Sequence, residues 1–146
     1  MKITITLFTL IGIAFITSSF INYGKQIDKF PQIQKYLECI KEMKMDGEKP
    51  MKISQKLNAK TFTYITNWYD VVSKDYYENI PWKDFNSVDY TIVDDKYTKC
   101  DFKFSSNMKL TTNNSTEVTD YFTCYIFTKD KEKVEKIVED FEENNY

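Results

Sequence analysis

The hydrophobic positions in the first half of the chain recur at helical spacing. Five apolar residues lie three or four positions apart, which places them on one face of a helix that begins at Pro31: Ile33, Tyr36, Leu37, Ile40 and Met43. Gly47 predicts the end of this helix and Pro50 a new beginning. Because Ile53 and Leu57 continue the spacing, we expect a second, short amphipathic helix from residue 50 to about residue 58.

Residues 61–72 carry two competing patterns. Residues 61–66 are rich in β-branched and aromatic side chains, which is typical of a strand. Helical spacing, however, connects Phe62, Ile65, Trp68, Tyr69 and Val72, and Thr61 can cap the first turn. Both readings stay open, and we predict a helix. The following segment, 76–82, is predicted to be extended because Pro81 disfavours a helical conformation of the residue before it.

The second half of the chain alternates at the period of a strand. We predict strands over Val88–Val93, Tyr97–Phe104 and Val118–Thr128. The last strand has aromatic residues on both faces, which favours a position covered on two sides. Asp130 then predicts the start of a C-terminal amphipathic helix, whose apolar face consists of Val134, Ile137, Val138 and Phe141.

The N-terminal segment resembles a secretory signal peptide. Lys2 precedes an uncharged apolar run, and small polar residues at 17–19 precede Phe20. An uncleaved membrane anchor is the alternative, because the run is close to the length of a membrane span. The absence of a basic stop-transfer cluster favours cleavage after Ser19, which leaves residues 20–146 as a single small domain. No second apolar run exists, so we expect a secreted protein whose mature chain has no membrane span.

Composition excludes several classes of site. The chain has no His, and all 20 basic residues are Lys. His-based catalytic triads, His-ligated metal sites and Arg clamps on phosphate are therefore excluded, and three Cys without His cannot form a four-ligand zinc site. We expect neither a metal nor another cofactor. The net charge of −2 argues against nucleic acid as a partner.

The three cysteines fall in the segment expected to be exported, where disulfides persist. A hairpin centred on Thr112 would place Cys100 opposite Cys124 and Phe102 opposite Phe122, all on one face. At a non-hydrogen-bonded position, such residues have Cα atoms about 4.5 Å apart, which a disulfide tolerates. We therefore predict a Cys100–Cys124 bridge. The rival is a bridge from Cys39 to either strand cysteine, and a break at residues 105–107 would favour it.

Two overlapping sequons accompany the cysteines. They begin at Asn113 and Asn114 and lie in the polar stretch from Thr111 to Glu117, where a surface turn is expected. If the chain follows a eukaryotic export route, we expect an N-glycan on one of the two.

A resemblance to a known family comes from the middle of the chain. The run Leu57-Asn58-Ala59-Lys60-Thr61-Phe62, followed by Ile65, Trp68-Tyr69 and Asp75-Tyr76, resembles the opening of the NTF2-like (SnoaL-like) superfamily. The resemblance covers about residues 50–80 and implies helices packed on a strongly curved antiparallel sheet. A C-terminal helix and the scarcity of glycine depart from that family. The predicted fold class is thus α+β: N-terminal helices packed on a curved antiparallel sheet, with a C-terminal amphipathic helix.

Without His and Arg, catalysis would have to use carboxylates, Tyr, Lys or Cys. The adjacent acids at 94–95 and 139–140 diverge in direction on either a strand or a helix, so they are interpreted as solvated charges. Asp89 with Tyr90 offers an acid and a hydroxyl, as in some NTF2-like isomerases. A catalytic Cys39 has no His partner.

Aromatic residues supply the candidate binding surface. Tyr and Trp offer large rigid contact area with a polar group, as interfaces and ligand pockets prefer. The candidates are Trp68, Tyr69, Tyr76, Tyr77 and Trp82. A core position is the favoured alternative for Trp68 and for Phe85, whereas Tyr76 and Tyr77 cannot both face inward because they are consecutive in an extended segment.

These observations favour a secreted, non-enzymatic binding protein that recognises a small apolar ligand or an extracellular protein. The alternatives are an NTF2-like enzyme that uses an acid and a Tyr, and a cystatin-like protease inhibitor. The latter shares a helix joined to an antiparallel sheet, but this sequence has no Gln-x-Val-x-Gly-type loop.

Signal cleavage gives a first test. The mature chain is expected to begin at Phe20, because Thr17 and Ser19 occupy the small-residue positions that precede a cleavage site. N-terminal sequencing of secreted material checks this, and material that begins at Met1 would contradict it.

Overall fold

A computed structural model of the chain describes residues 30–44 and 49–142. The predicted signal peptide, residues 1–19, lies outside this part. The elements follow one another as α2 (Phe30–Glu38), β1 (Glu42–Met43), β2 (Met51–Leu57), β3 (Thr61–Trp68), β4 (Val71–Glu78), a 3-10 turn (Trp82–Asp84), β5 (Phe85–Ile92), β6 (Tyr97–Thr112), β7 (Ser115–Phe127), a second 3-10 turn (Thr128–Asp130) and α3 (Lys131–Glu142).

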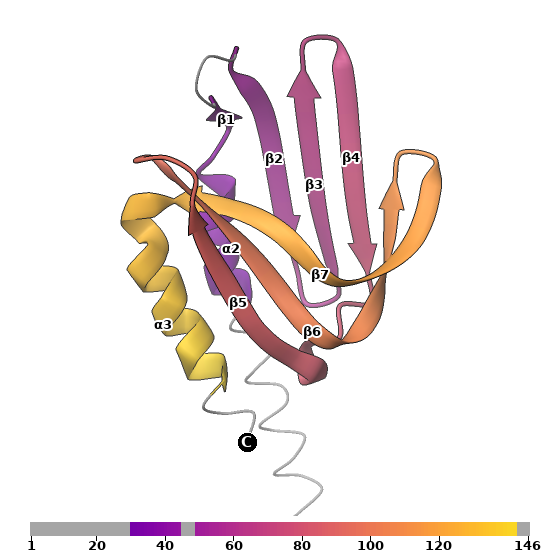
Figure 1. Ribbon diagram of the computed structural model, residues 1–146, viewed down its shortest axis with the longest axis vertical. Coiled ribbons are helices and arrows are strands. Elements are labelled where there is room, and N and C mark those ends of the chain that lie inside the picture. Colours follow the sequence, from indigo (N-terminus) through magenta and orange to yellow (C-terminus); the bar gives the residue numbers. More distant parts are fainter. Residues whose placement is uncertain (1–29, 45–48, 143–146) are drawn as a thin grey trace, which may run out of the picture.

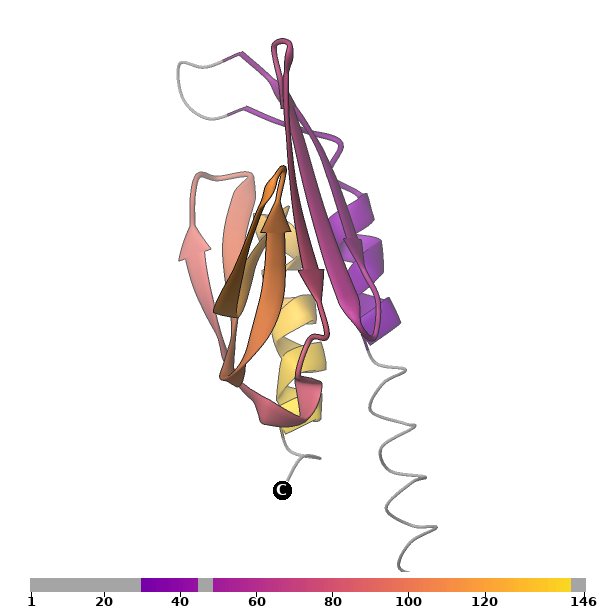
Figure 2. The same ribbon diagram turned by 90° about the vertical axis from the view of Figure 1, so that its right-hand side faces the viewer.

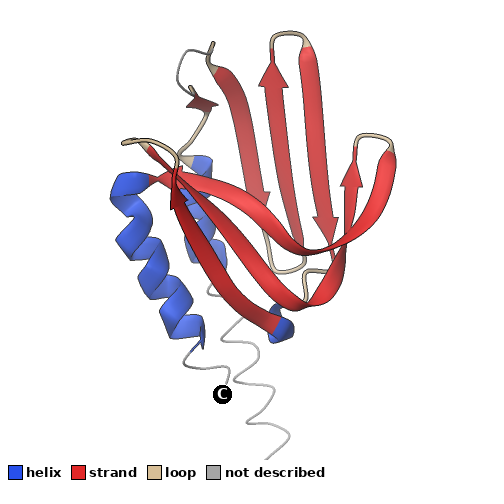
Figure 3. Ribbon diagram, in the orientation of Figure 1, coloured by secondary structure: helices blue, strands red, loops and turns tan. Residues whose placement is uncertain are grey.

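The strands form one curved antiparallel sheet, on which the helices pack (Figure 1, Figure 3). Their order is β1-β2-β3-β4-β6-β5, and β7 pairs with the other edge of β6. This arrangement confirms the predicted α+β class with a C-terminal helix. The prediction of several N-terminal helices is wrong. A single helix, α2, precedes the strands in the part of the chain that the structure describes.

A bend in β6 divides the sheet into two halves. The first part of β6 pairs with β5 and its last four residues, 109–112, pair with β4, so β4 and β5 share one edge of the same strand. Between the pairs Lys103–Tyr121 and Met108–Thr119, four residues of β6 lie opposite a single residue of β7. Such a bulge bends a strand and increases its twist. Figure 2 shows the result: the half that contains β5 stands apart from the layer of β2–β4.

Aromatic rings fill the space between the two halves. The ring of Phe122 on β7 lies 4.7 Å from Phe62 on β3, 5.9 Å from Tyr77 on β4 and 4.9 Å from Phe102 on β6, centroid to centroid. Trp82 packs edge-on against Phe122 at 6.0 Å. The two helices complete this core with fully buried aliphatic side chains, Leu37 from α2 and Val134 from α3.

A buried glutamine of β2 connects this strand to the free edge of β7. The backbone N–H of Tyr125 on β7 donates to Gln55 Oε1 (2.7 Å), and Gln55 Nε2 donates to the Tyr125 carbonyl (2.9 Å). The side chain of Gln34 from α2 bonds the β2 backbone in the same way. Its Nε2 donates to the Gln55 carbonyl, and its Oε1 accepts from the Leu57 N–H. Each side-chain amide takes the place of a missing neighbouring strand, so backbone groups that burial would otherwise penalise are satisfied.

Two predicted helices are wrong. Residues 51–57 form β2, in which Ile53, Gln55 and Leu57 alternate inward. A spacing of four residues, as between Ile53 and Leu57, fits a period of 2 as well as one of 3.6, so it could not separate the two structures. The predicted helix over 61–72 is a hairpin of β3 and β4, as the β-branched and aromatic composition indicated.

The later elements are confirmed. β5, β6 and β7 overlap the three predicted strands, and α3 follows Asp130. The predicted register is also confirmed, since Cys100 pairs with Cys124 and Phe102 with Phe122. The turn, however, lies at Asn113–Asn114 rather than at Thr112, and the bulge in β6 absorbs the difference.

Replacing Gln55 with Met tests the bridge between the sheet edges. Methionine keeps the length and volume of the side chain but leaves the Tyr125 N–H and C=O without partners, so we expect a loss of about 2–3 kcal/mol of unfolding free energy. Urea denaturation measures the loss, with the neighbouring exposed Ser54→Ala as the control, expected within about 0.5 kcal/mol of wild type. Equal stability of the Gln55→Met variant and wild type would show that the bridge contributes nothing.

Candidate functional site

Two exposed aromatic residues, Trp68 and Tyr69, lie together at the tip of the β3–β4 hairpin. Trp68 pairs with Val71, so Tyr69 and Asp70 alone form the turn. Within residues 68–72, four apolar side chains are exposed: Trp68 at 42%, Tyr69 at 59%, Val71 at 69% and Val72 at 56%. The tip lies at the top of the molecule in Figures 1 and 2.

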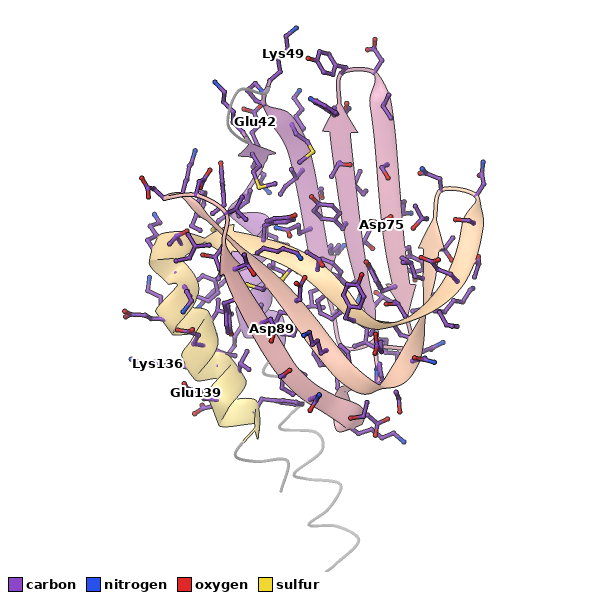
Figure 4. The ribbon with its side chains drawn as sticks, viewed as in Figure 1. Glu42, Lys49, Asp75, Asp89, Lys136 and Glu139 are labelled. Carbon is purple, nitrogen blue, oxygen red and sulfur yellow. The ribbon has the colours of Figure 1, made fainter. Side chains whose placement is uncertain are left out.

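The turn holds an aromatic residue in an uncommon backbone conformation. Tyr69 has φ = 56°, in the left-handed region that two-residue hairpin turns require and that Gly or Asn occupies most easily. Its ring lies 5.4 Å from that of Trp68, and Lys49 Nζ lies 5.0 Å from its centroid. Figure 4 labels Lys49 at this end of the molecule. The two rings and the ammonium therefore form one contiguous surface.

Trp68 lies on the core face of the sheet but beyond the end of the core. Alternation along β3 places Phe62, Tyr64 and Trp68 on the same face. Phe62 is covered by Phe122, and Tyr64 by Tyr125 at 6.0 Å between ring centroids. At 42% exposure, Trp68 extends past this cover, so the core position favoured for it from the sequence is wrong.

The other aromatic candidates lie elsewhere. Tyr77 and Trp82 are buried at 7% and 6% exposure and belong to the core, and Phe85 packs against the same core. Tyr76 faces the opposite side of β4 from Tyr77 and is half-buried, with Lys74 Nζ 5.6 Å from its ring. The structure thus brings Trp68 and Tyr69 together and separates them from the remaining three candidates.

Val71 and Val72 are members of the site that sequence reasoning missed. The helical spacing predicted for residues 61–72 includes Val72 and does not include Val71. Their signal is the run Trp68-Tyr69-Asp70-Val71-Val72, in which Asp70 marks a turn between two β-prone segments.

The candidate acid–hydroxyl pair does not converge. Asp89 is exposed and forms an ion pair with Lys103 on the neighbouring strand β6, while Tyr90 points to the other face of β5. Tyr90 lines an open pocket of about 200 Å³ between β5 and α3, together with Ser87, Val88, Glu135, Val138 and Glu139. Glu135 is itself paired with Lys131, whose ammonium lies 5.2 Å from the Tyr90 ring centroid.

The interior phenols are not bases at neutral pH. Burial raises the pKa of Tyr64 and of Tyr77 far above the ordinary value, and Asp75 adds to both shifts. Burial also raises the pKa of Tyr125. These hydroxyls stay protonated, and their rings serve packing.

Within residues 30–44 and 49–142, no group of three Cys, Asp or Glu side chains is placed to hold a metal ion. In the same part of the chain, no helix is long and apolar enough to cross a membrane.

The two sequons lie at the β6–β7 turn. Asn113 has φ = 48°, its N–H donates to the Lys74 carbonyl (3.1 Å) and its Oδ1 accepts from the Lys74 N–H (3.2 Å). Asn114 is exposed in the same turn. Both positions are on the surface, as expected for the turn, and the glycan stays a prediction.

Cys100 and Cys124 are buried directly opposite each other, and the structure carries both as thiols. Because the Tyr125 N–H and C=O point away from β6 toward Gln55, alternation makes the Cys100–Cys124 pair a hydrogen-bonded one. Its Cα separation is then about 5.5 Å rather than about 4.5 Å, still within the range of a disulfide. Burial raises the pKa of the Cys124 thiol, and a hydrogen bond with Cys100 adds to the shift.

Cys39 lies apart from this pair. It is exposed, and its thiol donates to the Lys35 carbonyl one turn earlier in α2 (3.0 Å). A bridge from Cys39 to either buried strand cysteine would require the side chain to turn from solvent into the core.

Comparisons with family models, with curated proteins and with solved structures find no match to this chain.

The cysteine geometry predicts the disulfide pairing. In material folded under oxidising conditions, we expect a Cys100–Cys124 bridge that closes a loop of about 25 residues and stabilises the fold by about 3 kcal/mol. Since both thiols are buried in the folded chain and burial raises the pKa of the Cys124 thiol, the bridge should form during folding rather than after it. Peptide mapping without reduction measures the pairing. A cross-linked peptide that contains Cys39 as the main species would overturn it.

Proposed function

We propose that this protein is a secreted, non-enzymatic binding protein whose contact surface is the tip of the β3–β4 hairpin. The observation that carries the proposal is the exposure of four apolar side chains within five residues, two of them Trp68 and Tyr69. Exposed contiguous apolar surface of this kind marks interaction sites, and Trp and Tyr supply large rigid contact area.

The filled interior supports a macromolecular partner over a small apolar ligand. The two halves of the sheet are in contact through aromatic rings: the centroid of Phe122 on β7 lies 4.7 Å from that of Phe62 on β3 and 5.9 Å from that of Tyr77 on β4. An enclosed apolar ligand would need the volume that these rings occupy. Binding at the surface leaves this packing unchanged.

The placement of the acids supports a non-enzymatic role. Catalytic carboxylates must converge on one reacting group. Asp89 instead pairs with Lys103 on the outside of the sheet, and Glu135 pairs with Lys131. The NTF2-like resemblance stays a proposal about architecture, and no catalytic residue is carried over from it.

Site-specific cross-linking tests the proposal without a known partner. A photoreactive phenylalanine analogue replaces Tyr69 in one variant and Ile92 in a control, two residues of matched exposure at 59% and 62%. After illumination in the natural extracellular fluid or at the cell surface, we expect discrete protein or lipid adducts at position 69 and none at position 92.

Two results would contradict the proposed function. One is equal labelling at the two positions, which would indicate that the tip is not a preferred surface. The other is a small molecule that stays bound to the unlabelled protein in native mass spectrometry. It would indicate that the binding site lies in the interior or in the pocket between β5 and α3.

A further inference from the structure

We propose that the partner of the hairpin tip is the interfacial region of a phospholipid bilayer, into which Trp68, Tyr69, Val71 and Val72 insert. The inference rests on the proposed function and names its partner. It goes beyond a generic contact because the shape, the residue types and the charges of the tip each favour a lipid surface.

The tip is apolar on both faces of the hairpin. Trp68 and Val71 are directly paired and share the core face, whereas Val72 pairs with Asn67 and lies on the opposite face. Tyr69 occupies the apex between the two faces. A protein that covers one face of the sheet leaves the other face in water, but a bilayer surrounds an inserted tip on every side.

The depth of the apolar zone matches interfacial insertion. It comprises the turn and two residue pairs, Trp68–Val71 and Asn67–Val72, and ends at the polar pair Thr66–Ser73. Two pairs span about 7 Å at the rise of a strand, within the 5–10 Å to which interfacial elements are buried. Trp and Tyr are the side chains enriched at this level of a membrane.

Lysines lie beside the apolar zone. Lys49 approaches the Tyr69 ring, and Lys52 is paired with Asn67 in the second level from the apex. Ammonium groups at this height meet the phosphates of the headgroups when the tip is inserted. Asp70 at the apex carries the opposing charge, so the tip is limited to the headgroup region and does not enter the hydrocarbon core.

The backbone of Tyr69 indicates that the ring at the apex has a role other than folding. A bulky side chain at φ = 56° costs free energy that Asn or Gly would not. Tyr69→Asn therefore separates the two roles: it keeps the turn and removes the ring.

The test uses the full secreted chain with vesicles of phosphatidylcholine, alone or mixed with phosphatidylserine. Of the two Trp residues, Trp82 is 6% exposed and Trp68 is 42% exposed, so a change in intrinsic fluorescence reports on Trp68. We expect co-sedimentation with both vesicles, a shift of the emission to shorter wavelength, and about fivefold tighter binding when phosphatidylserine is present. Lys49→Gln combined with Lys52→Gln should abolish the difference between the two vesicles.

Four variants locate the contact. Trp68→Ala and Tyr69→Asn should each weaken binding about tenfold, while the unfolding midpoint of Tyr69→Asn is unchanged or higher. Asp70→Asn should tighten binding because it removes the apex charge. Ile92→Ala, which removes an exposed apolar side chain outside the tip, should bind like wild type.

Three outcomes would overturn the lipid inference. They are the absence of binding to either vesicle, weakening by Ile92→Ala equal to that by Trp68→Ala, and unchanged binding in Tyr69→Asn. If the tip forms adducts with a protein at position 69 while vesicles fail to bind, the partner is a protein. The proposed function then stands and the lipid inference is rejected.

Discussion

The bend in β6 is the constraint on which the rest of the structure depends. One strand of 16 residues supports β5 near its beginning, β4 at its end and β7 along its other edge. The four residues that lie opposite Asp120 reorient the strand, so that the β2–β4 half of the sheet faces the half that contains β5. Without the bulge, the aromatic faces of β3 and β7 would lie in one continuous surface instead of meeting across a core.

The same bend determines where the protein can bind. It brings Phe122 against Phe62 and Tyr77, and the rings leave the interior occupied. Gln55 then holds β7 beside β2 by satisfying both backbone groups of Tyr125. This cover extends over the lower part of β3 and β4 but not over their tip. The hairpin therefore carries apolar residues past the end of the core, and its exposure follows from the length of the strands relative to the layer that covers them.

Local patterns in the sequence predicted the second half of the fold and missed part of the first. Alternation around Phe102 and Phe122 identified both strands, and the assumed hairpin centre at Thr112 supplied their register. The turn was displaced because the polar run from 105 to 107 became a bulge within β6, which alternation alone does not reveal. Between residues 50 and 72, the few apolar residues lie three or four positions apart, a spacing that fits a helix. The β-branched composition of residues 61–66 instead indicated the strand that the structure has there.

The candidate site was predicted in its residue types but not in its extent. Trp68 and Tyr69 were identified as aromatic candidates together with Tyr77 and Trp82, and only the tertiary structure separates them. Trp68 has the residue type and the strand face that are typical of a core position. It is exposed because the side chains of β7 cover Phe62 and Tyr64 of β3 but do not reach Trp68. The end of this cover is set by contacts such as Phe62–Phe122 and Tyr64–Tyr125, which join segments about 60 residues apart in sequence and which no local pattern encodes.

Hydrogen exchange of the full chain with and without phospholipid vesicles tests the central claim most directly, namely that a filled, rigid fold presents one hairpin tip to a lipid surface. The account predicts that vesicles slow the exchange of backbone amides at residues 67–72 and at Lys49. The exchange rates in β5, in α3 and in the buried, paired part of β6 and β7 should stay unchanged. Protection that instead appears along β5 and α3, or that spreads through the core strands, would contradict it.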